Sequence, residues 1–344
     1  MKQRGSLDVA KFLCAILVLL IHTNPFASYS KILTFGLRNV VTVIAVPFFF
    51  CCSGYLVAEK LKNLQNYQER KCYIGKYLKR LIVIYLVWSA VYFPFVVLRW
   101  IREGFSYALV LKYLWDFFLE GSFSTIWFLP ALMSAVALYW LLRQKYNSKT
   151  IFFIGCGIYV ITLLLSSYYG ITARIPGLMF LGEQYYRLFD NVKNGVLFGL
   201  VFVSMGGMLS EETWFHGFTR KKALIGGIAC YGLLCIEAVA CNVIGNVKGV
   251  DTVITILPLT ICAFIFALSY DIPSSNICIT LRKHSMLIFL CQRIPITLIE
   301  MFLDQTILAT NSVVNCLTVS AVSFFISHVL LQLSKKWHWL KKIY

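Results

Sequence analysis

Charged residues are scarce in this sequence, and their scarcity limits the class of protein. Of the 344 residues, 14% are charged and 59% are hydrophobic, and the mean hydropathy is +0.74. A soluble domain carries about 25% charged and about 45–50% apolar residues. The composition therefore argues against a water-soluble globular domain, a disordered chain and a secreted disulfide framework.

Acidic residues are the scarcer of the two charged classes. The chain has 15 Asp and Glu against 32 Lys and Arg, for a net charge of +17. In a soluble protein such an excess would point to nucleic acid as a partner. In an apolar chain the simpler cause is the enrichment of Lys and Arg in cytoplasmic loops. We therefore expect a lipid bilayer, and no nucleic acid, around this protein.

The sequence also lacks the short motifs of common metal and nucleotide sites. No CxxC, HExxH, GxGxxG or Walker loop is present, and the histidines show no ligand spacing. The twelve cysteines lie mostly in apolar stretches, where Cys is typical as a small buried hydrophobe. We expect no metal site and no permanently bound cofactor.

Long apolar stretches dominate what is present. A helix needs about 20 apolar residues to cross a bilayer. We therefore predict one domain over 1–344, an all-α integral membrane protein with about ten transmembrane helices. The predicted spans are 7–24, 40–58, 81–98, 126–142, 150–168, 194–210, 223–243, 252–270, 285–304 and 312–334.

The connections between these stretches predict the orientation. With the N-terminus inside, inner segments hold 21 Lys and Arg residues and outer segments hold nine, so both termini are predicted to be cytoplasmic. The amphipathic segment 105–118 is expected to lie in the membrane interface. The two longest outer connections, 99–125 and 169–193, are expected to cap an outward-facing cavity.

The first span carries three ionisable side chains on one face. Asp8 precedes Lys11 by three residues, and His22 follows it by eleven, just over three helical turns or roughly 16 Å along the axis. Such groups are costly against lipid, so we expect them to face protein or a watery cavity. The alternative for Asp8 and Lys11 is an interfacial helix start with a snorkelling lysine. The alternative for His22 is packing or capping near the outer end of the helix.

Five segments, in this order, resemble signatures of one known family. The spacing Lys11-x10-His22 resembles the Arg-x10-His motif in the first helix of the membrane-bound acyltransferases of family 3. Further resemblances are VPFFFCCSGY at 46–55, YLKRL at 77–81, IWFLPAL at 126–132, and NGVLFG at 194–199 followed by Gly206 and Gly207. IHTNPF at 21–26 is similar to a small bacterial branch, which includes O-acetyltransferases and the membrane half of vancomycin-resistance serine racemases.

The resemblance implies a membrane-bound O-acyltransferase of the bacterial inner membrane. Acyl-CoA, with acetyl-CoA as the expected donor, would enter from the cytoplasm. The acyl group would pass to a cell-envelope acceptor such as a glycan hydroxyl or a small molecule. His22 stands at the position of the family's general base or transient acyl carrier, and imidazole titrates near working pH. Lys11, with Asp8 beside it, stands at the position of the motif's arginine.

Donor phosphates require an inner basic funnel. The candidates beside Lys11 are Lys76, Lys79 and Arg80, whose alternative is topogenic charge. Four further residues are expected to line the cavity, namely Ser53, Trp127, Gln292 and Arg293. The alternative for Ser53 is helix packing, and the alternative for Trp127 is the aromatic belt at the membrane surface. The alternative for Arg293 is pairing with other helices.

The sequence departs from the family pattern at two positions, and the first departure favours a rival function. Lys11 lacks the planar fork with which arginine binds phosphate or carboxylate in a bidentate manner. Gln292 stands near a position where many relatives have a histidine, and an amide cannot act as a base. The rival is a transport module for serine or another small molecule, which would use the same cavity without acyl chemistry.

Overall fold

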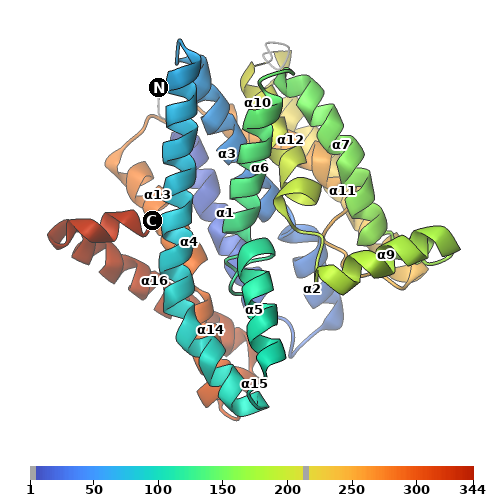
Figure 1. Cartoon of the computed structure of the whole chain (residues 1–344), viewed down its shortest axis with the longest axis vertical. Helices are drawn as coiled ribbons and strands as arrows, with labels where there is room; N and C mark the ends of the chain where they lie inside the picture. Colours follow the sequence, from blue (N-terminus) through green and yellow to red (C-terminus); the bar gives the residue numbers. More distant parts are fainter. Residues whose placement is uncertain (1–4, 212–216) are drawn as a thin grey trace.

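The computed structural model describes residues 5–211 and 217–344, and their regular structure is helical (Figure 1). The first half contains α1 (Gly5–Thr23), α2 (Lys31–Gly36), the π-helix η1 (Leu37–Val41), α3 (Ala45–Lys62), α4 (Tyr67–Glu103), α5 (Tyr107–Leu119), α6 (Phe128–Leu142) and α7 (Ser148–Leu165). The second half contains α8 (Tyr169–Thr172), α9 (Pro176–Leu188), the π-helix η2 (Gly195–Gly199), α10 (Leu200–Glu211), α11 (Arg220–Ile244), α12 (Ile256–Leu268), α13 (Asn276–Cys291), α14 (Arg293–Phe302), α15 (Ile307–Thr310), α16 (Ser312–Lys336) and the 3₁₀ helix η4 (His338–Lys342).

The helices confirm an all-α, multi-pass membrane protein. Within the described residues, seven helical segments are long and apolar enough to cross a bilayer. Three shorter apolar helices, Phe128–Leu142, Gly195–Glu211 and Ile256–Leu268, match three more of the predicted stretches. Each of the ten predicted stretches thus falls on one of these segments, whereas the number of full crossings remains a prediction.

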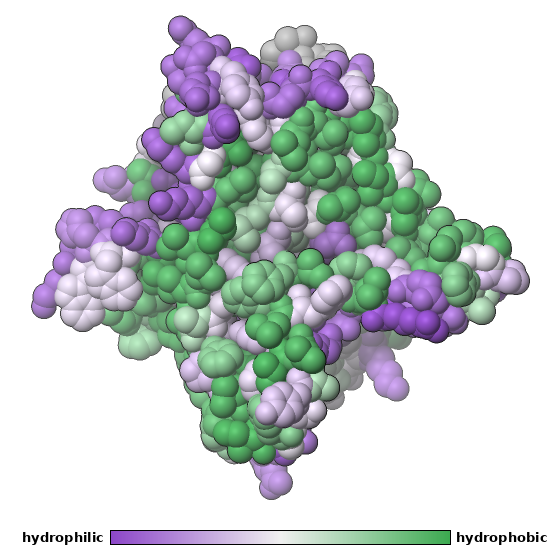
Figure 2. All heavy atoms as spheres, viewed as in Figure 1, coloured by the Kyte–Doolittle hydropathy of each residue, from purple (hydrophilic) through white to green (hydrophobic). Residues whose placement is uncertain are grey.

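The outward faces of several helices are strongly apolar. Only 17% of the apolar window of Arg220–Ile244 and 22% of that of Ser312–Lys336 is buried within the protein. Soluble monomers rarely expose continuous apolar patches of this extent. Figure 2 shows hydrophilic side chains gathered at the end of the molecule where α4 begins, with broad apolar areas beyond them. The exposed apolar faces of α11 and α16 suit contact with lipid chains.

Polar side chains at the helix starts explain where several helices begin. Asn66 accepts a hydrogen bond from the Glu69 N–H at the start of α4, and Asn147 does the same for Thr150 at the start of α7. Thr219 and Ser275 cap α11 and α13 in the same way. Each cap satisfies a backbone N–H that has no partner within its own helix.

The centre of the molecule is a close contact between α3 and α10, and α1 packs against α13 beside it. Small residues make the α3–α10 approach possible. A Cβ atom at Gly54 would overlap the Val203 carbonyl, and one at Gly206 would overlap the Cys51 carbonyl and lie 2.6 Å from the Tyr55 amide nitrogen. This contact holds α3 in the position from which it lines the cavities described below.

We expect Gly206→Ala to lower the free energy of unfolding by about 1–3 kcal/mol, because the added methyl meets backbone that cannot move aside. Gly157→Ala on α7 is the matched control, since its Cβ would meet nothing within 4 Å. There the change should be neutral or stabilising by about 0.5–1 kcal/mol. Denaturant unfolding in detergent micelles measures both, and equal stability of the two variants would contradict the prediction.

Candidate active site

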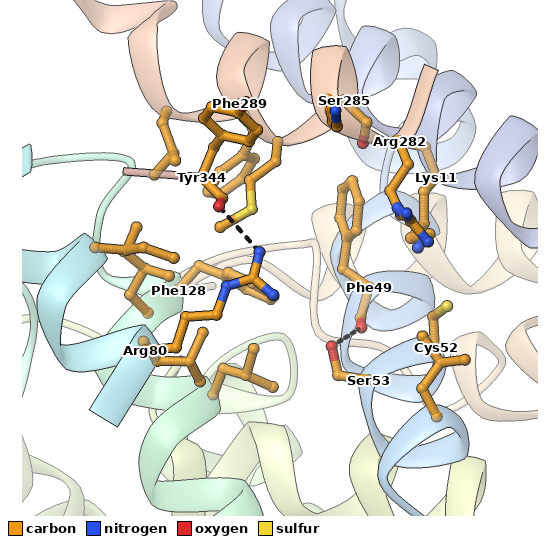
Figure 3. Close-up of a pocket in the computed structure, with 18 of the residues that line it drawn as sticks. Lys11, Phe49, Cys52, Ser53, Arg80, Phe128, Arg282, Ser285, Phe289 and Tyr344 are labelled. Atoms are coloured by element: carbon orange, nitrogen blue, oxygen red, sulfur yellow. Dashed lines mark hydrogen bonds between the residues drawn. The ribbon is translucent and has the colours of Figure 1, made fainter. Parts of the chain in front are cut away.

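An inner cavity of about 590 Å³ lies between α1, α3, α4, α6, α13 and the last residues of the described chain (Figure 3). Its polar lining is strongly basic, and no Asp or Glu belongs to the described residues that line it. A concave, water-accessible space with this charge is suited to polyanionic ligands. The basic lining residues are Lys11, Arg80, Arg282, Lys283 and Lys341.

Asp8 holds two of these cations in place. The Asp8 carboxylate lies 3.0 Å from the Lys11 Nζ and 3.8 Å from the Arg282 Nη1. Its side chain is only 6% exposed. The predicted proximity of Asp8 and Lys11 is confirmed, because residues three apart on a helix are neighbours. Arg282 was not predicted as a cavity residue, because in the sequence it counts among the charges of a connection next to a span.

Arg80 is the single member of the predicted basic run that lines the inner cavity. The lining residues of α4 are Tyr77, Arg80, Leu81 and Ile84, the spacing of one helix face. Lys76 and Lys79 are exposed and lie off this face, so the structure does not bring them to the cavity with Arg80.

The last residues of the chain also border this cavity. The Arg80 guanidinium donates a hydrogen bond to the Tyr344 backbone oxygen at 2.9 Å, which Figure 3 shows as a dashed line. The Trp88 indole N–H donates to the Ile343 carbonyl at 3.0 Å, and the Tyr344 hydroxyl lies 2.8 Å from the Ser334 hydroxyl. These contacts bring Lys341 to the rim of the basic cavity.

Ser53 lines the inner cavity, but its hydroxyl is already engaged. It donates to the Phe49 carbonyl one turn earlier on α3 at 2.9 Å (Figure 3). This bond within the helix is the usual way for a serine to satisfy its hydroxyl in a membrane helix. The serine therefore combines the cavity position with the packing alternative, and the neighbouring Gly54 makes the contact with α10.

An aromatic layer closes the inner cavity. The Phe49 and Phe289 ring centroids lie 5.9 Å apart, those of Phe128 and Phe289 lie 5.4 Å apart, and those of Phe49 and Phe128 lie 6.1 Å apart. Phe289 also lines a second cavity, so the two cavities share this residue. Figure 3 shows Phe49, Phe128 and Phe289 around the space near Arg80.

The second, outer cavity has a volume of about 110 Å³ and contains His22. Helix α1 thus contributes to both cavities, with Lys11 in the inner one and His22 in the outer one. The side chains around His22 come from distant segments, including both π-helices. The polar and aromatic lining consists of His22, Arg38, Asn39, Thr125, Trp127, Lys193, Phe198, Asp251 and Phe289.

Both long outer connections contribute to this cavity. Thr125 is the last residue of connection 99–125, and Lys193 is the last residue of connection 169–193, five residues after the end of α9. The connections are joined by an ion pair of 2.7 Å between Lys112 and Asp190 and by a 2.7 Å hydrogen bond from the Trp115 indole to the Leu188 carbonyl. The segment predicted to lie in the interface forms α5, which takes part in these contacts.

Trp127 lines the outer cavity, as proposed from the sequence, whereas Gln292 and Arg293 line neither of the two cavities. Gln292 is fully buried and its side-chain amide donates to the Phe289 carbonyl at 3.2 Å. Arg293 lies 3.3 Å from Glu300 on the same helix, α14, so its ion-pair partner does not come from another helix, as the alternative had expected.

Comparison with known proteins agrees with the family resemblance. Residues 4–332 match the model of a family described as the acyltransferase domain. The chain is 26% identical over 332 residues to an amino-acid racemase of Enterococcus faecalis, which covers 95% of this chain and 45% of that protein. A second amino-acid racemase of Enterococcus faecalis is 28% identical over 344 residues, covering 98% and 47%.

A serine/alanine racemase of Enterococcus gallinarum is 26% identical over 239 residues, which covers 69% of this chain and 33% of that protein. The chain therefore spans about half the length, or less, of these curated relatives. No solved structure matches it.

Proposed function

Because the chain belongs to the acyltransferase domain family, we propose that it is a membrane-bound O-acyltransferase of the bacterial cytoplasmic membrane. It would move an acyl group, most simply acetyl, from cytoplasmic acyl-CoA to a hydroxyl of the cell envelope. The observation that carries the proposal is the pair of cavities. A basic cavity suited to CoA and a smaller cavity containing His22 share Phe289 as a lining residue.

The donor side of the proposal rests on the charges of the inner cavity. CoA carries a diphosphate and a further phosphate, and arginine binds such groups through two parallel hydrogen bonds. Arg80 and Arg282 supply this fork, while Lys11 and Lys283 act as point charges. The replacement of the family's arginine by Lys11 is thus offset by Arg282, which shares Asp8 with it.

The acceptor side of the proposal rests on His22. The thioester end of the donor would pass the Phe289 ring and meet the acceptor hydroxyl in the outer cavity. His22 would take the hydroxyl proton as the oxygen forms a new C–O bond to the acyl carbon. The C–S bond then breaks, and the proton passes from His22 to the departing CoA sulfur. The products are an ester and free CoA.

The proposal includes ten crossings with both termini in the cytoplasm. The basic residues of the inner cavity belong to segments assigned to the cytoplasmic side by their Lys and Arg content, or to the first turns of α1. The connections that meet over His22 would then face outward. This arrangement gives each substrate access from its own side of the membrane.

The test is binding and turnover of labelled acetyl-CoA by the purified protein in lipid nanodiscs. We expect saturable binding that weakens with added salt, because the phosphate contacts are partly solvent-screened. We also expect slow release of acetate, since water can take the place of an absent acceptor. Absence of binding at low salt would contradict the proposal.

We expect Arg80→Gln to weaken acetyl-CoA binding about 10-fold, the loss of one charge-assisted hydrogen bond. The variant should also reduce the salt dependence of the binding. Lys79→Gln is the matched control, because it removes the same charge from the next residue of α4, off the cavity face. Equal weakening by both variants would mean that general surface charge, and not the cavity, attracts the donor.

A second function is favoured by one observation. Two cavities that share one aromatic lining residue are also the arrangement expected of a transporter with a closed gate between its two sides. The curated relatives are named amino-acid and serine/alanine racemases, which makes serine the natural cargo to try. Flux of labelled serine into proteoliposomes without CoA would support transport, and flux equal to that of empty liposomes would exclude it.

A further inference from the structure

The residues that line the outer cavity carry a net positive charge, with two cations and one carboxylate. Lys193 and Asp251 line it and form an ion pair with each other. Arg38 also lines it, yet no carboxylate of the described residues lies within ion-pair distance of its guanidinium. Arg293, which lines neither of the two cavities, forms an ion pair with Glu300. Arg38, which is exposed, is therefore the cation of this lining that has no carboxylate partner among the described residues.

A buried hydroxyl in the same cavity also lacks a partner. Thr125 is 1% exposed and lines the cavity, and its Oγ1 has no hydrogen-bond partner among the described residues. A buried hydroxyl without a partner costs about 1–3 kcal/mol. A ligand with a hydroxyl in this space would satisfy Thr125 next to the His22 imidazole.

The local backbone supports a binding role. Arg38 and Asn39 project from the π-helix η1, and Phe198 belongs to the π-helix η2. Within the described residues both π-helices therefore contribute side chains to this one cavity. Such irregular turns are frequent at functional sites, since they redirect side chains that a regular helix would place elsewhere.

The volume limits what the cavity accepts. About 110 Å³ equals the share of roughly four water molecules in the liquid. Only a small molecule, or the reacting end of a larger one, fits beside Trp127 and Phe289. A hydroxyl and one adjacent charged group are of this size.

We propose that the outer cavity binds an acceptor whose reacting hydroxyl stands next to an anionic group, a carboxylate or a phosphate. The anion lies against the free Arg38 guanidinium, and the hydroxyl lies between His22 and Thr125. This inference rests on the proposed function, for which it names the acceptor class. A neutral sugar hydroxyl would form no ion pair with Arg38, whose exposed guanidinium would keep water as its partner.

The test is calorimetric titration of small ligands into the protein in phosphatidylcholine nanodiscs, without acyl-CoA. Glycolate and glycerol 1-phosphate carry both groups, ethylene glycol lacks the charge and acetate lacks the hydroxyl. We expect both hydroxy anions to bind more tightly than ethylene glycol or acetate, at least about 10-fold. Equal binding of glycolate and ethylene glycol, or no binding of either hydroxy anion, would overturn the inference.

Two variants tie the binding to the cavity. Arg38→Gln should weaken glycolate binding at least about 10-fold, whereas Arg174→Gln, an exposed outer arginine away from the cavity, should leave it unchanged. Asp251→Asn should strengthen binding, because it releases Lys193 from its ion pair. A gain of affinity cannot arise from a damaged fold. Unchanged affinity in both Arg38→Gln and Asp251→Asn would refute the assignment.

The headgroup of phosphatidylglycerol carries the same two groups, a hydroxyl and an anion. A competition experiment with this lipid therefore tells whether the natural ligand is a lipid headgroup or a small free anion. Competition by phosphatidylglycerol nanodiscs against glycolate would identify a lipid acceptor, and its absence would identify a small free anion. The titrations do not involve CoA, so they test the acceptor inference independently of the acyltransferase proposal. Donor binding without anion binding overturns only the inference, and anion binding without donor binding overturns the acyltransferase proposal.

Discussion

Replacement of His22 by alanine is expected to lower acyl transfer by about 10²–10⁴-fold, the usual contribution of a positioned general base. The physical reason is that a hydroxyl is a weak nucleophile until its proton is removed as the bond forms. His22 is the histidine of the described residues that lines the outer cavity, so no other imidazole there can take over. Acetyl-CoA binding should persist, because the donor's phosphates belong to the inner cavity.

The measurement is single-turnover acyl transfer from labelled acetyl-CoA to an acceptor, with donor binding recorded on the same sample. His328→Ala is the matched control, since His328 is an exposed histidine of α16 that lines neither cavity. It should keep full activity. Full activity in His22→Ala would remove the assignment of His22 as the base, and parallel loss of activity and donor binding would indicate a structural role.

Replacement of Asp8 by alanine is expected to lower the free energy of unfolding by about 3 kcal/mol. Asp8 is buried, and its removal leaves Lys11, itself 15% exposed, without its partner. Loss of one partner of a buried ion pair costs about 3–5 kcal/mol because the remaining charge stays unneutralised. We expect the lower end of this range, because Arg282 is 39% exposed and partly solvated.

Glu59→Ala tests whether burial is the cause. Glu59 and Lys62 form an ion pair with the same three-residue spacing on α3, but their side chains are 30% and 40% exposed. Its loss should change the unfolding free energy by less than about 1 kcal/mol. Adding Lys11→Met to Asp8→Ala should restore part of the stability, since the unpaired charge is then gone. Denaturant unfolding of the wild type and the three variants measures these differences, and a wild-type stability of Asp8→Ala would contradict the account.

The same carboxylate connects stability to donor binding. Asp8 orients Lys11 and Arg282, which stand side by side at the inner cavity in Figure 3. A cation without a carboxylate partner attracts a phosphate more strongly, because no neighbouring negative charge offsets its own. A cation paired with a carboxylate attracts the phosphate less, but its side chain is held in a fixed position. Lys11 and Arg282 are held in position by their carboxylate partner. Arg80 has no carboxylate partner among the described residues and donates to a backbone oxygen.

The sequence by itself determined the helices and the contacts within them. The apolar stretches predicted the seven long apolar helices found among the described residues, because a continuous run of apolar residues in lipid can satisfy its backbone only as a helix. The Asp8–Lys11 pair and the Arg293–Glu300 pair were predictable for the same reason: each lies on one regular helix, where spacing alone decides which side chains are neighbours.

Only the tertiary structure decided which residues share a cavity. Arg282, Lys283 and Lys341 join Lys11 and Arg80 although they are far away in the chain, and Lys76 and Lys79 do not, although they are close. Likewise His22 meets Arg38 and Thr125 only through the turns of η1 and the outer connections. The physical reason is that a cavity depends on how helices pack, and packing depends on contacts such as Gly206 against Cys51, where the absence of a side chain sets the distance between two helices.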